Sequence, residues 1–227
     1  MNPLVHFCRA LEARLFPGRV GRRRRRDWEA NWRRPDFAPA WAGRGIASEI
    51  VQSARSGWFP PAGRVLDIGC GLAEIAAWFS ERGYSASGID IADAAVVKAR
   101  AMHRHMPSAP TLFTHDICAA PPPGGPYDIL IDRGCLHQIP SGSVARYVRH
   151  IAAVSASDAR MMLFMRAFRN GRAIGDADET KRLAEWVTGT FDGIFDMQHV
   201  ALTYLDRYKG KNPSNVLPGL VFHLTKA

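Results

Sequence analysis

The chain has 227 residues, of which 47% are hydrophobic and 22% are charged, a balance typical of one compact folded protein rather than a disordered or collagen-like chain. Its apolar runs are far shorter than the roughly 20 residues that a membrane-spanning helix requires, so we expect a soluble protein. The four cysteines form no CxxC pair, which argues against a zinc knuckle or a disulfide framework and favours a cytoplasmic location.

The net charge of +9 is concentrated at the N-terminus. Residues 1–44 carry 11 arginines against four acidic residues, whereas residues 45–227 carry 19 basic and 17 acidic residues. The run Arg22–Arg26 could neutralise phosphates of RNA or anionic lipid head groups. We instead expect a solvated, poorly ordered tail, which is the commoner fate of a terminal charge run. A nucleic-acid contact stays an alternative, and contact of residues 1–26 with a membrane surface is not expected.

Ahead of the arginines, an apolar stripe with helical spacing predicts a short helix that ends at Pro17 and Gly18. The stripe consists of Leu4, Phe7, Cys8, Leu11, Leu15 and Phe16.

Between residues 28 and 41, four aromatic residues, three of them tryptophans, are interleaved with Pro35 and Pro39, so we expect a segment without regular secondary structure. Trp28, Trp32 and Trp41 could be core residues, but aromatic faces beside a cleft also suit a flat or cationic ligand. Residues 1–44 are therefore predicted to be a basic, aromatic arm on a domain formed by residues 45–227. The next helix is expected around Ile46–Ala54, ahead of the prolines at 60 and 61.

From Gly63 onward, predicted strands alternate with predicted helices, which requires parallel strands joined by right-handed crossovers. The strands are expected at Arg64–Ile68, Ser85–Ile89, Thr111–His115, Tyr127–Asp132 and Arg160–Met165. The helices are expected at Leu72–Glu81, Ala92–His105, Ser143–Ala156 and near Glu179–Phe191. The last two strands, Phe195–Tyr204 and Val216–Leu224, have no room between them for a crossover helix and should pair antiparallel. The predicted fold class is α/β with a doubly wound sheet.

A glycine turn follows the first of these strands. The stretch Val65–Glu74 (VLDIGCGLAE) is a buried strand that runs into a helix, and its glycines would let a ligand approach the backbone. A dinucleotide fingerprint would place its third glycine at residue 74, where this chain has a glutamate. Because Glu74 and Asp67 would both repel a pyrophosphate, the turn favours an adenosyl ligand that lacks phosphate and carries a cationic sulfonium and ammonium.

Two further strands end in an acidic residue. Asp90 lies 19 residues beyond the last glycine of the turn, where a carboxylate can accept hydrogen bonds from both ribose hydroxyls. A helix N-cap is the alternative role for Asp90, although Asp93 could fill it. Asp116 can accept from the exocyclic amine of adenine while Ile91 and Ile117 sandwich the ring. Since ligands of open α/β sheets bind at the carboxyl edge, these acids predict an adenosine site there.

These motifs resemble those of the class I S-adenosylmethionine-dependent methyltransferases. The matching segments are VLDIGCG at Val65–Gly71, GIDI around Asp90, HDI around Asp116 and YDILIDRGCLH at Tyr127–His137. The resemblance covers residues 46–225 and implies a Rossmann-like, seven-stranded, mostly parallel sheet with a C-terminal antiparallel hairpin. It also implies S-adenosylmethionine as the cofactor. At Ala73 many members have a third glycine.

The resemblance assigns cofactor-binding roles along four strand ends. It implies Asp67, Gly69 and Gly71 for the methionine moiety, Asp90 for the ribose, Asp116 and Ile117 for the adenine, and Asp132 and Arg133 for the outer edge of the sulfonium. Cys70 and Ile91 complete the expected cofactor-binding set.

The tryptophan segment is loosely similar to the N-terminal segment of the thiopurine and thiol methyltransferase group, which covers the cofactor and forms part of the substrate pocket. The similarity rests on Trp28-Glu-Ala-Asn-Trp32 followed by Pro39-Ala-Trp41-Ala-Gly43. It implies a lid and substrate role for Trp28, Trp32 and Trp41.

The methyl acceptor is expected above the segment Asp132–Gln138. Methyl transfer is an in-line displacement at an activated carbon, so the protein mainly aligns the reactants and excludes water, and no metal is expected. We take His137 and Asp132 as candidate catalytic residues. His137 could act as general base for a hydroxyl or a protonated amine, whereas a thiolate needs none, and an ordinary loop role for His137 stays open. Cys135 is simpler to explain as a packing residue.

The predicted function is S-adenosylmethionine-dependent transfer of a methyl group to a sulfur, oxygen or nitrogen atom of a small molecule. One alternative is an RNA or protein methyltransferase anchored by Arg22–Arg26, although no Asn-Pro-Pro-Tyr-type motif follows the fourth strand. Another is a non-catalytic S-adenosylmethionine-binding scaffold, against which the four strand-end acids argue. No oligomeric state is predicted.

Overall fold

The computed structural model describes residues 15, 17–37, 39, 45–166, 168–169, 172–173, 177–207 and 216–227. Its main sheet contains β1 (Arg64–Ile68), β2 (Ser85–Asp90), β3 (Thr111–Thr114), β4 (Tyr127–Arg133), β5 (Ser155–Arg166), β8 (Phe195–Arg207) and β9 (Val216–Lys226). The helices are α2 (Pro17–Arg33), α3 (Ser48–Arg55), α4 (Glu74–Ser80), α5 (Asp93–His103), α6 (Ser141–Val154) and α7 (Ala177–Phe191), with a short 3-10 turn, η1 (Leu136–Gln138). A separate pair, β6 (Phe168–Arg169) and β7 (Arg172–Ala173), was not expected from the sequence.

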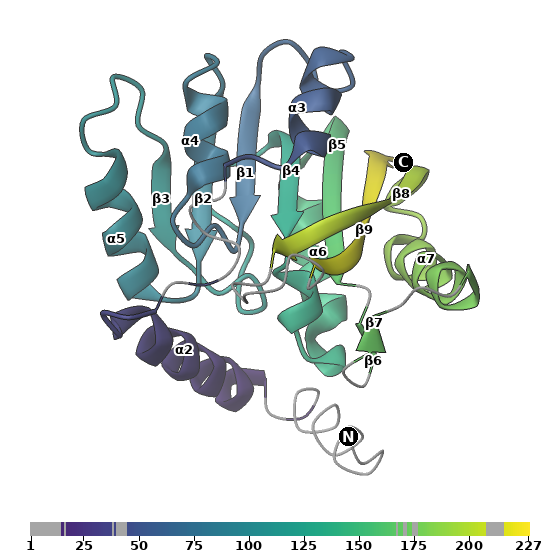
Figure 1. Cartoon of the computed structure of the whole chain (residues 1–227), viewed down its shortest axis with the longest axis horizontal. Coiled ribbons are helices and arrows are strands. Elements are labelled where there is room, and N and C mark those ends of the chain that lie inside the picture. The colour runs from purple at the N-terminus through teal and green to yellow at the C-terminus, as the bar shows by residue number, and fades with distance from the viewer. Residues whose placement is uncertain are drawn as a thin grey trace.

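The seven strands follow the order β3-β2-β1-β4-β5-β9-β8 (Figure 1). Strands β1 to β5 pair in parallel, and β9 runs antiparallel to both β5 and β8. This confirms the doubly wound, mostly parallel sheet with a C-terminal antiparallel hairpin. From β1 the chain builds the sheet outward first through β2 and β3 on one side and then through β4 and β5 on the other. Ligands of such sheets bind outside the carboxyl ends of the strands at this point, between β1 and β4.

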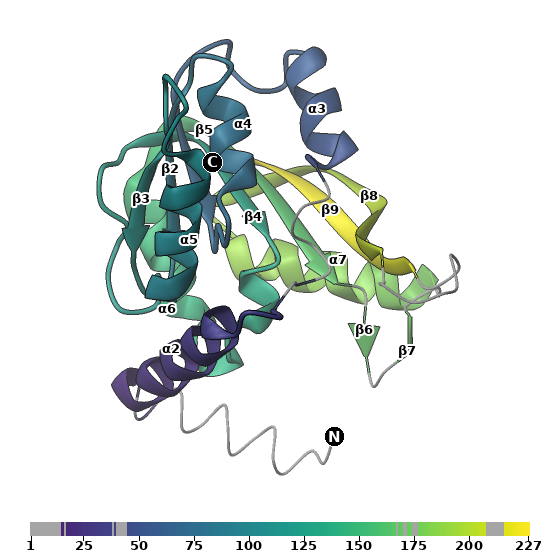
Figure 2. The same cartoon turned by 60° about the vertical axis from the view of Figure 1, so that its left-hand side comes forward.

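Helices cover both faces of the sheet (Figure 2), so the central strands are buried on both sides. Ile129 and Ile131 of β4 pack in one core with α3, α4 and α5, whereas Leu130 between them packs in a second core with α6 and α7. A strand buried on both faces reads as a continuous apolar run, which is why β4 and β5 could be found in the sequence.

Helix α2 corrects our expectation for the N-terminal arm. The arginine run is not a poorly ordered tail, and residues 28–33 are not irregular: both lie in one helix from Pro17 to Arg33. Proline is tolerated in the first turn of a helix, arginine is a good helix former, and the next proline is Pro35, beyond the helix. Pro17 therefore lies in a helix, although we expected it to end one.

A stripe at intervals of four residues attaches α2 to the domain. Val20 and Trp32 are buried, and Arg24 and Trp28 are partly buried between them. Figures 1 and 2 show α2 lying across the carboxyl edge of the parallel strands. Trp41 and the apolar stripe at residues 4–16, apart from Leu15, lie outside the described residues. Within the described part of the chain, no helix is long and apolar enough to cross a membrane.

Candidate active site

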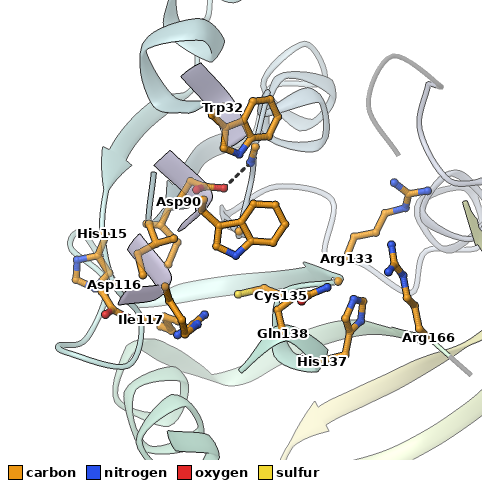
Figure 3. Close-up of a pocket in the computed structure, with 17 residues that line it drawn as sticks. Trp32, Asp90, His115, Asp116, Ile117, Arg133, Cys135, His137, Gln138 and Arg166 are labelled. Carbon is orange, nitrogen blue, oxygen red and sulfur yellow. Dashed lines mark hydrogen bonds between the residues drawn. The ribbon is translucent and has the colours of Figure 1, made fainter. Parts of the chain in front are cut away.

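A pocket opens at the carboxyl edge of the sheet, between the strand ends and α2 (Figure 3). It is lined by Arg24, Trp28, Trp32, Gly69, Gly71, Ile89, Asp90, Ile91, His115, Asp116, Ile117, Arg133, Gly134, Cys135, His137, Gln138 and Arg166. The strand-end motifs singled out in the sequence therefore meet at one cavity.

The turn after β1 forms a close-fitting floor of this pocket. Gly69 and Gly71 have positive φ angles of 70° and 53°. A Cβ at Gly69 would come within 2.8 Å of the Cβ of Cys135, and one at Gly71 within 3.2 Å of the Trp32 ring. Glycine is needed at both positions for conformation and for space. Ala73 also has a positive φ of 56°, so the departure from the family's third glycine leaves a left-handed alanine just before α4.

Asp90 connects two backbone segments at the edge of the pocket. One carboxylate oxygen accepts a hydrogen bond from the Gly71 amide at 3.0 Å, and the other accepts from the Ala92 amide at 2.9 Å. Neither Asp90 nor Asp93 is the N-cap of α5. The N-cap residue is Ala92, and its own side chain makes no capping hydrogen bond. Burial raises the pKa of Asp90 above its ordinary value. The carboxylate lines the pocket and at the same time fixes the glycine turn.

Asp116 and Ile117 lie beyond β3 at the same end of the pocket as Asp90, and Figure 3 shows all three together. One oxygen of Asp116 accepts from the Cys118 amide at 2.9 Å. A Cβ at Gly21 of α2 would come within 2.8 Å of the other oxygen, so the helix passes directly over this carboxylate.

Two of the expected acids lie beneath the pocket rather than in its wall. Asp67 accepts from the Ala76 amide at the start of α4, and burial raises its pKa to about 7. Asp132 accepts from the amides of Gly134, Cys135 and Leu136 and from the Tyr147 hydroxyl. Burial outweighs these hydrogen bonds and raises the pKa of Asp132 to about 6. Both carboxylates hold the loops that form the pocket.

Helix α2 forms the roof of the pocket. The ring of Trp32 lies against Gly71, and Trp28 lines the cavity one turn earlier. Glu29 accepts a hydrogen bond from the Ala94 amide of α5 at 3.1 Å, which ties the roof to the domain. Arg24 approaches the sulfur of Cys118 at 3.8 Å.

His137 lies in η1 at the other end of the pocket, with its ring packed on Gly134. Its Nδ1 atom is buried and has no hydrogen-bond partner among the described residues. Burial, with the nearby Arg166 charge, lowers the pKa of His137 to about 4. The imidazole is therefore neutral at pH 7.

The pocket brings together most of the residues that we expected to form a site. Gly69, Gly71, Asp90, Ile91, Asp116, Ile117, Arg133, His137, Trp28 and Trp32 all line it, whereas Asp67, Cys70 and Asp132 do not, and Trp41 lies outside the described residues. Sequence reasoning did not single out Arg24, Ile89, His115, Gly134, Gln138 and Arg166 as lining residues, and Cys135, which we took as a packing residue, also lines the pocket. Arg166 could have been found from its place at the end of a predicted strand, whereas Arg24 becomes a site residue only through the packing of α2.

Comparison with known proteins agrees with this geometry. Residues 40–203 match the model of a family described as a methyltransferase domain. One similar structure comes from echinomycin biosynthesis, where a disulfide bond is converted into a thioacetal group; it has a TM-score of 0.70 at 18% identity over 88% of this chain and 91% of that one.

Two further structures share the fold. The 1,6-didemethyltoxoflavin-N1-methyltransferase of Burkholderia thailandensis, with bound 1,6-didemethyltoxoflavin and S-adenosylhomocysteine, has a TM-score of 0.59 at 18% identity over 100% of this chain and 92% of that one. The N-methyltransferase NodS of Bradyrhizobium japonicum, in complex with S-adenosylhomocysteine, has a TM-score of 0.61 at 12% identity. The match covers 88% of this chain and 97% of that one. The family match spans most of the chain, and this protein belongs to the methyltransferase-domain family as a class I S-adenosylmethionine-dependent methyltransferase.

Proposed function

We propose that the protein transfers the methyl group of S-adenosylmethionine to a nucleophilic sulfur, oxygen or nitrogen atom of a small molecule. The observation that carries this proposal is the roof formed by α2, because Trp32, Glu29 and Arg24 hold it across the strand ends and leave a cavity beneath. We take residues 1–44 as the arm and lid and residues 45–227 as the catalytic domain.

The residues present fit the cofactor. The glycine turn offers backbone without side chains, and Asp90 and Asp116 offer carboxylates at the β2 and β3 ends of the pocket. We assign Asp90 to the ribose, and Asp116 with Ile117 and Ile91 to the adenine. Trp28 and Trp32 would cover the ligand from above. When bound, S-adenosylmethionine supplies a methyl group activated by a positive sulfur.

His137 has the protonation state that a general base needs. With its pKa at about 4, the imidazole is neutral at pH 7, and it lines the pocket where an acceptor hydroxyl or amine would lie. Its low basicity suits a thiol acceptor equally, because a thiolate forms without a base. Asp132, which we expected to be catalytic, is proposed as a positioning residue, since its carboxylate holds the amides of residues 134–136.

The alternative acceptor classes are RNA and proteins. The exposed arginines of α2 favour this alternative, because they form a basic surface beside the pocket. Against it, the roof leaves a cavity rather than an open groove over the glycine turn.

A turnover screen tests the proposal. The full chain is incubated with S-adenosylmethionine and panels of thiols, phenols, amines and heterocycles, and release of S-adenosylhomocysteine is measured. We expect turnover with one small-molecule class. Methylation of RNA or of a protein without turnover of any small molecule would instead establish the alternative, and binding of S-adenosylhomocysteine without any methylation would indicate a scaffold.

A further inference from the structure

The roof helix α2 spans the end of the pocket that is proposed for the cofactor. In its first half, a Cβ at Gly21 would come within 2.8 Å of a carboxylate oxygen of Asp116. Eleven residues later, the ring of Trp32 lies against Gly71 of the glycine turn. Eleven helical residues extend about 16 Å, so α2 passes over the pocket floor from one contact to the other. A ligand lying on that floor would be covered by the helix.

The apolar part of this roof rests on the first turn of α5. Trp32 forms one small buried cluster with Ala92 and Ala95, and the partly buried Leu72 packs against it. Phe37 packs edge-on against the indole, with the ring centroids 5.1 Å apart. The end of α2 and the start of α5 therefore share one contact surface, and Figure 1 shows these two helix ends beside each other.

A charged hydrogen bond completes the contact between the two helices. One carboxylate oxygen of Glu29 accepts from the Ala94 amide at 3.1 Å, and the other accepts from Nε of Arg33, one turn along α2, at 2.7 Å. Burial acts to raise the pKa of Glu29, but these hydrogen bonds outweigh it and lower the pKa below its ordinary value. The first amides of a helix have no partner within the helix, and its dipole favours a negative charge there. Glu29 meets both needs of α5 from a different helix.

The same turn of α5 is also held from inside the pocket. Asp90 accepts from the Ala92 amide with one carboxylate oxygen and from the Gly71 amide with the other. Helix α2 contacts both of the segments that Asp90 joins, through Glu29 at the start of α5 and through Trp32 at the glycine turn. The contacts that close the roof are thus made to the backbone that forms the proposed ribose site.

We propose that Glu29 is the latch of α2: its hydrogen bond to the start of α5 keeps the helix over the pocket, and the cofactor enters and leaves when this bond breaks. The proposal rests on the cofactor placement given above. Glu29 does not line the pocket, so it is a positioning residue for Trp28 and Trp32, which do. Once α2 lifts, water can replace Glu29 as the acceptor for the Ala94 amide, so opening leaves no buried donor unpaired.

The test measures how fast the product form of the cofactor binds and leaves. Surface plasmon resonance on the immobilised full chain gives both rate constants for S-adenosylhomocysteine. In Glu29→Ala we expect association and dissociation each to become roughly 5- to 20-fold faster, from the lower range for a charged hydrogen bond, because the Glu29 side chain is 19% exposed. The dissociation constant should change by less than about threefold, because a latch slows entry and exit alike.

Two further variants assign the effect to the carboxylate. Glu29→Gln keeps an acceptor oxygen for the Ala94 amide and loses the charge, so both rate constants should lie between those of the natural protein and Glu29→Ala. Arg33→Gln removes the group that orients the carboxylate and should also accelerate both steps, which tests the latch even if Glu29→Ala does not fold. Asp27→Ala is the matched control, since Asp27 lies on the same helix outside the pocket with a 64% exposed side chain. Both rate constants should stay unchanged in it.

Each contrary outcome has a distinct meaning. If dissociation alone becomes faster and the dissociation constant rises to match, Glu29 stabilises only the bound state, and the latch is wrong. If the melting temperature falls while neither rate constant changes, Glu29 is a structural contact and the cofactor passes by another route. Both results leave the methyltransferase function intact. If the natural protein does not bind S-adenosylhomocysteine at all, the cofactor placement fails, and the latch fails with it.

Discussion

Asp90 holds two backbone segments together and also lines the pocket. Its two oxygens already accept hydrogen bonds from the Gly71 and Ala92 amides, yet carboxylate oxygens have further lone pairs and Asp90 lines the pocket. A ribose bound there would meet a carboxylate that the backbone has already oriented.

We expect Asp90→Asn to weaken binding of S-adenosylhomocysteine by about 1.5–3 kcal/mol, the range for hydrogen bonds to a charged group, as measured by calorimetry. The variant should also lose about 1–3 kcal/mol of stability, because asparagine has one acceptor oxygen and leaves either the Gly71 or the Ala92 amide without its buried partner. Asp93→Asn is the control, since Asp93 is an exposed residue three positions along that does not line the pocket. Equal affinity in both variants would place the ribose contact elsewhere.

The shifted pKa of His137 makes the stability of the folded protein depend on pH. Its pKa is about 4 in the folded protein and 6.5 ordinarily, so between these values the unfolded chain takes up a proton that the folded chain does not. The contribution of His137 to stability is therefore complete above pH 6.5 and is lost as the pH falls toward 4.

We expect His137→Gln to reduce the acid-side loss of stability. Relative to pH 7, the free energy of unfolding at pH 4.5 should fall by about 2 kcal/mol more in the natural protein than in the variant, from roughly 1.4 kcal/mol per pKa unit with an allowance for partial exposure. Urea unfolding at the two pH values measures the difference. Asp67 and Asp132, whose raised pKa values act in the opposite direction, contribute equally to both proteins. Identical pH dependence in the two proteins would show that His137 titrates normally.

At the scale of elements, one side of the basic helix α2 lines the pocket. The stripe of Val20, Arg24, Trp28 and Trp32 turns inward, and most of the remaining arginines turn outward. A helix with one apolar stripe needs a surface to bury it, and the turn after β1 together with the start of α5 supplies that surface.

We expect Trp32→Ala to open the roof. The variant should bind S-adenosylhomocysteine more weakly and lose more turnover than thermal stability, because the indole covers the glycine turn. In the natural protein, S-adenosylhomocysteine should change the tryptophan fluorescence and slow hydrogen exchange in α2. Trp186→Ala provides the control, since Trp186 is 41% exposed and lies on α7. If α2 exchanges equally with and without ligand, and Trp32→Ala only lowers the melting temperature, Trp32 is a core residue and the lid role is wrong.

Variants on the exposed face of α2 distinguish a small-molecule acceptor from an RNA acceptor. Replacing the exposed Arg22, Arg25 and Arg26 by glutamine leaves the inward stripe intact. We expect small-molecule turnover to stay within a few-fold of the natural protein. If these arginines instead anchor RNA, affinity for single-stranded RNA should fall with salt at a log-log slope of roughly −0.7 per phosphate contacted, and the triple variant should flatten that slope. An RNA substrate methylated only by the natural protein would reverse our ranking of the two functions.

At the scale of the whole molecule, the pocket proposed for the cofactor is formed by separate elements, namely the ends of β1 to β4 and the helix above them. Because only the folded chain brings these elements together, a ligand that binds there stabilises the fold as a whole.

We expect S-adenosylhomocysteine to raise the free energy of unfolding by about 2.7 kcal/mol at a free concentration a hundredfold above its dissociation constant. NADH should produce no shift, because Glu74 begins α4 where a dinucleotide site requires glycine and Asp67 lies beneath the same turn. Denaturant midpoints with each ligand measure both effects. Stabilisation by NADH alone would overturn the choice of cofactor.

The sequence by itself determined the sheet, the cofactor class and most of the pocket floor. Buried strands such as Val65–Ile68, apolar except for Asp67, and Ile129–Ile131 stand out in the sequence, and each is followed by a glycine or an acid whose place at the carboxyl edge follows from parallel topology. Local chemistry and connectivity sufficed for these residues.

Only the tertiary structure decided which strand-end side chains line the pocket and which helix covers it. Asp67 and Asp132, like Asp90, follow an apolar residue in a buried strand, yet they bind the loops at α4 and η1 and do not line the pocket, whereas Asp90 and Asp116 do. Helix α2 likewise forms where charge alone indicated a tail, because the packing of Trp32 on Gly71 is a contact between residues far apart in the chain. Burial by distant segments leaves no local pattern, and that is why these features could not be read from the sequence.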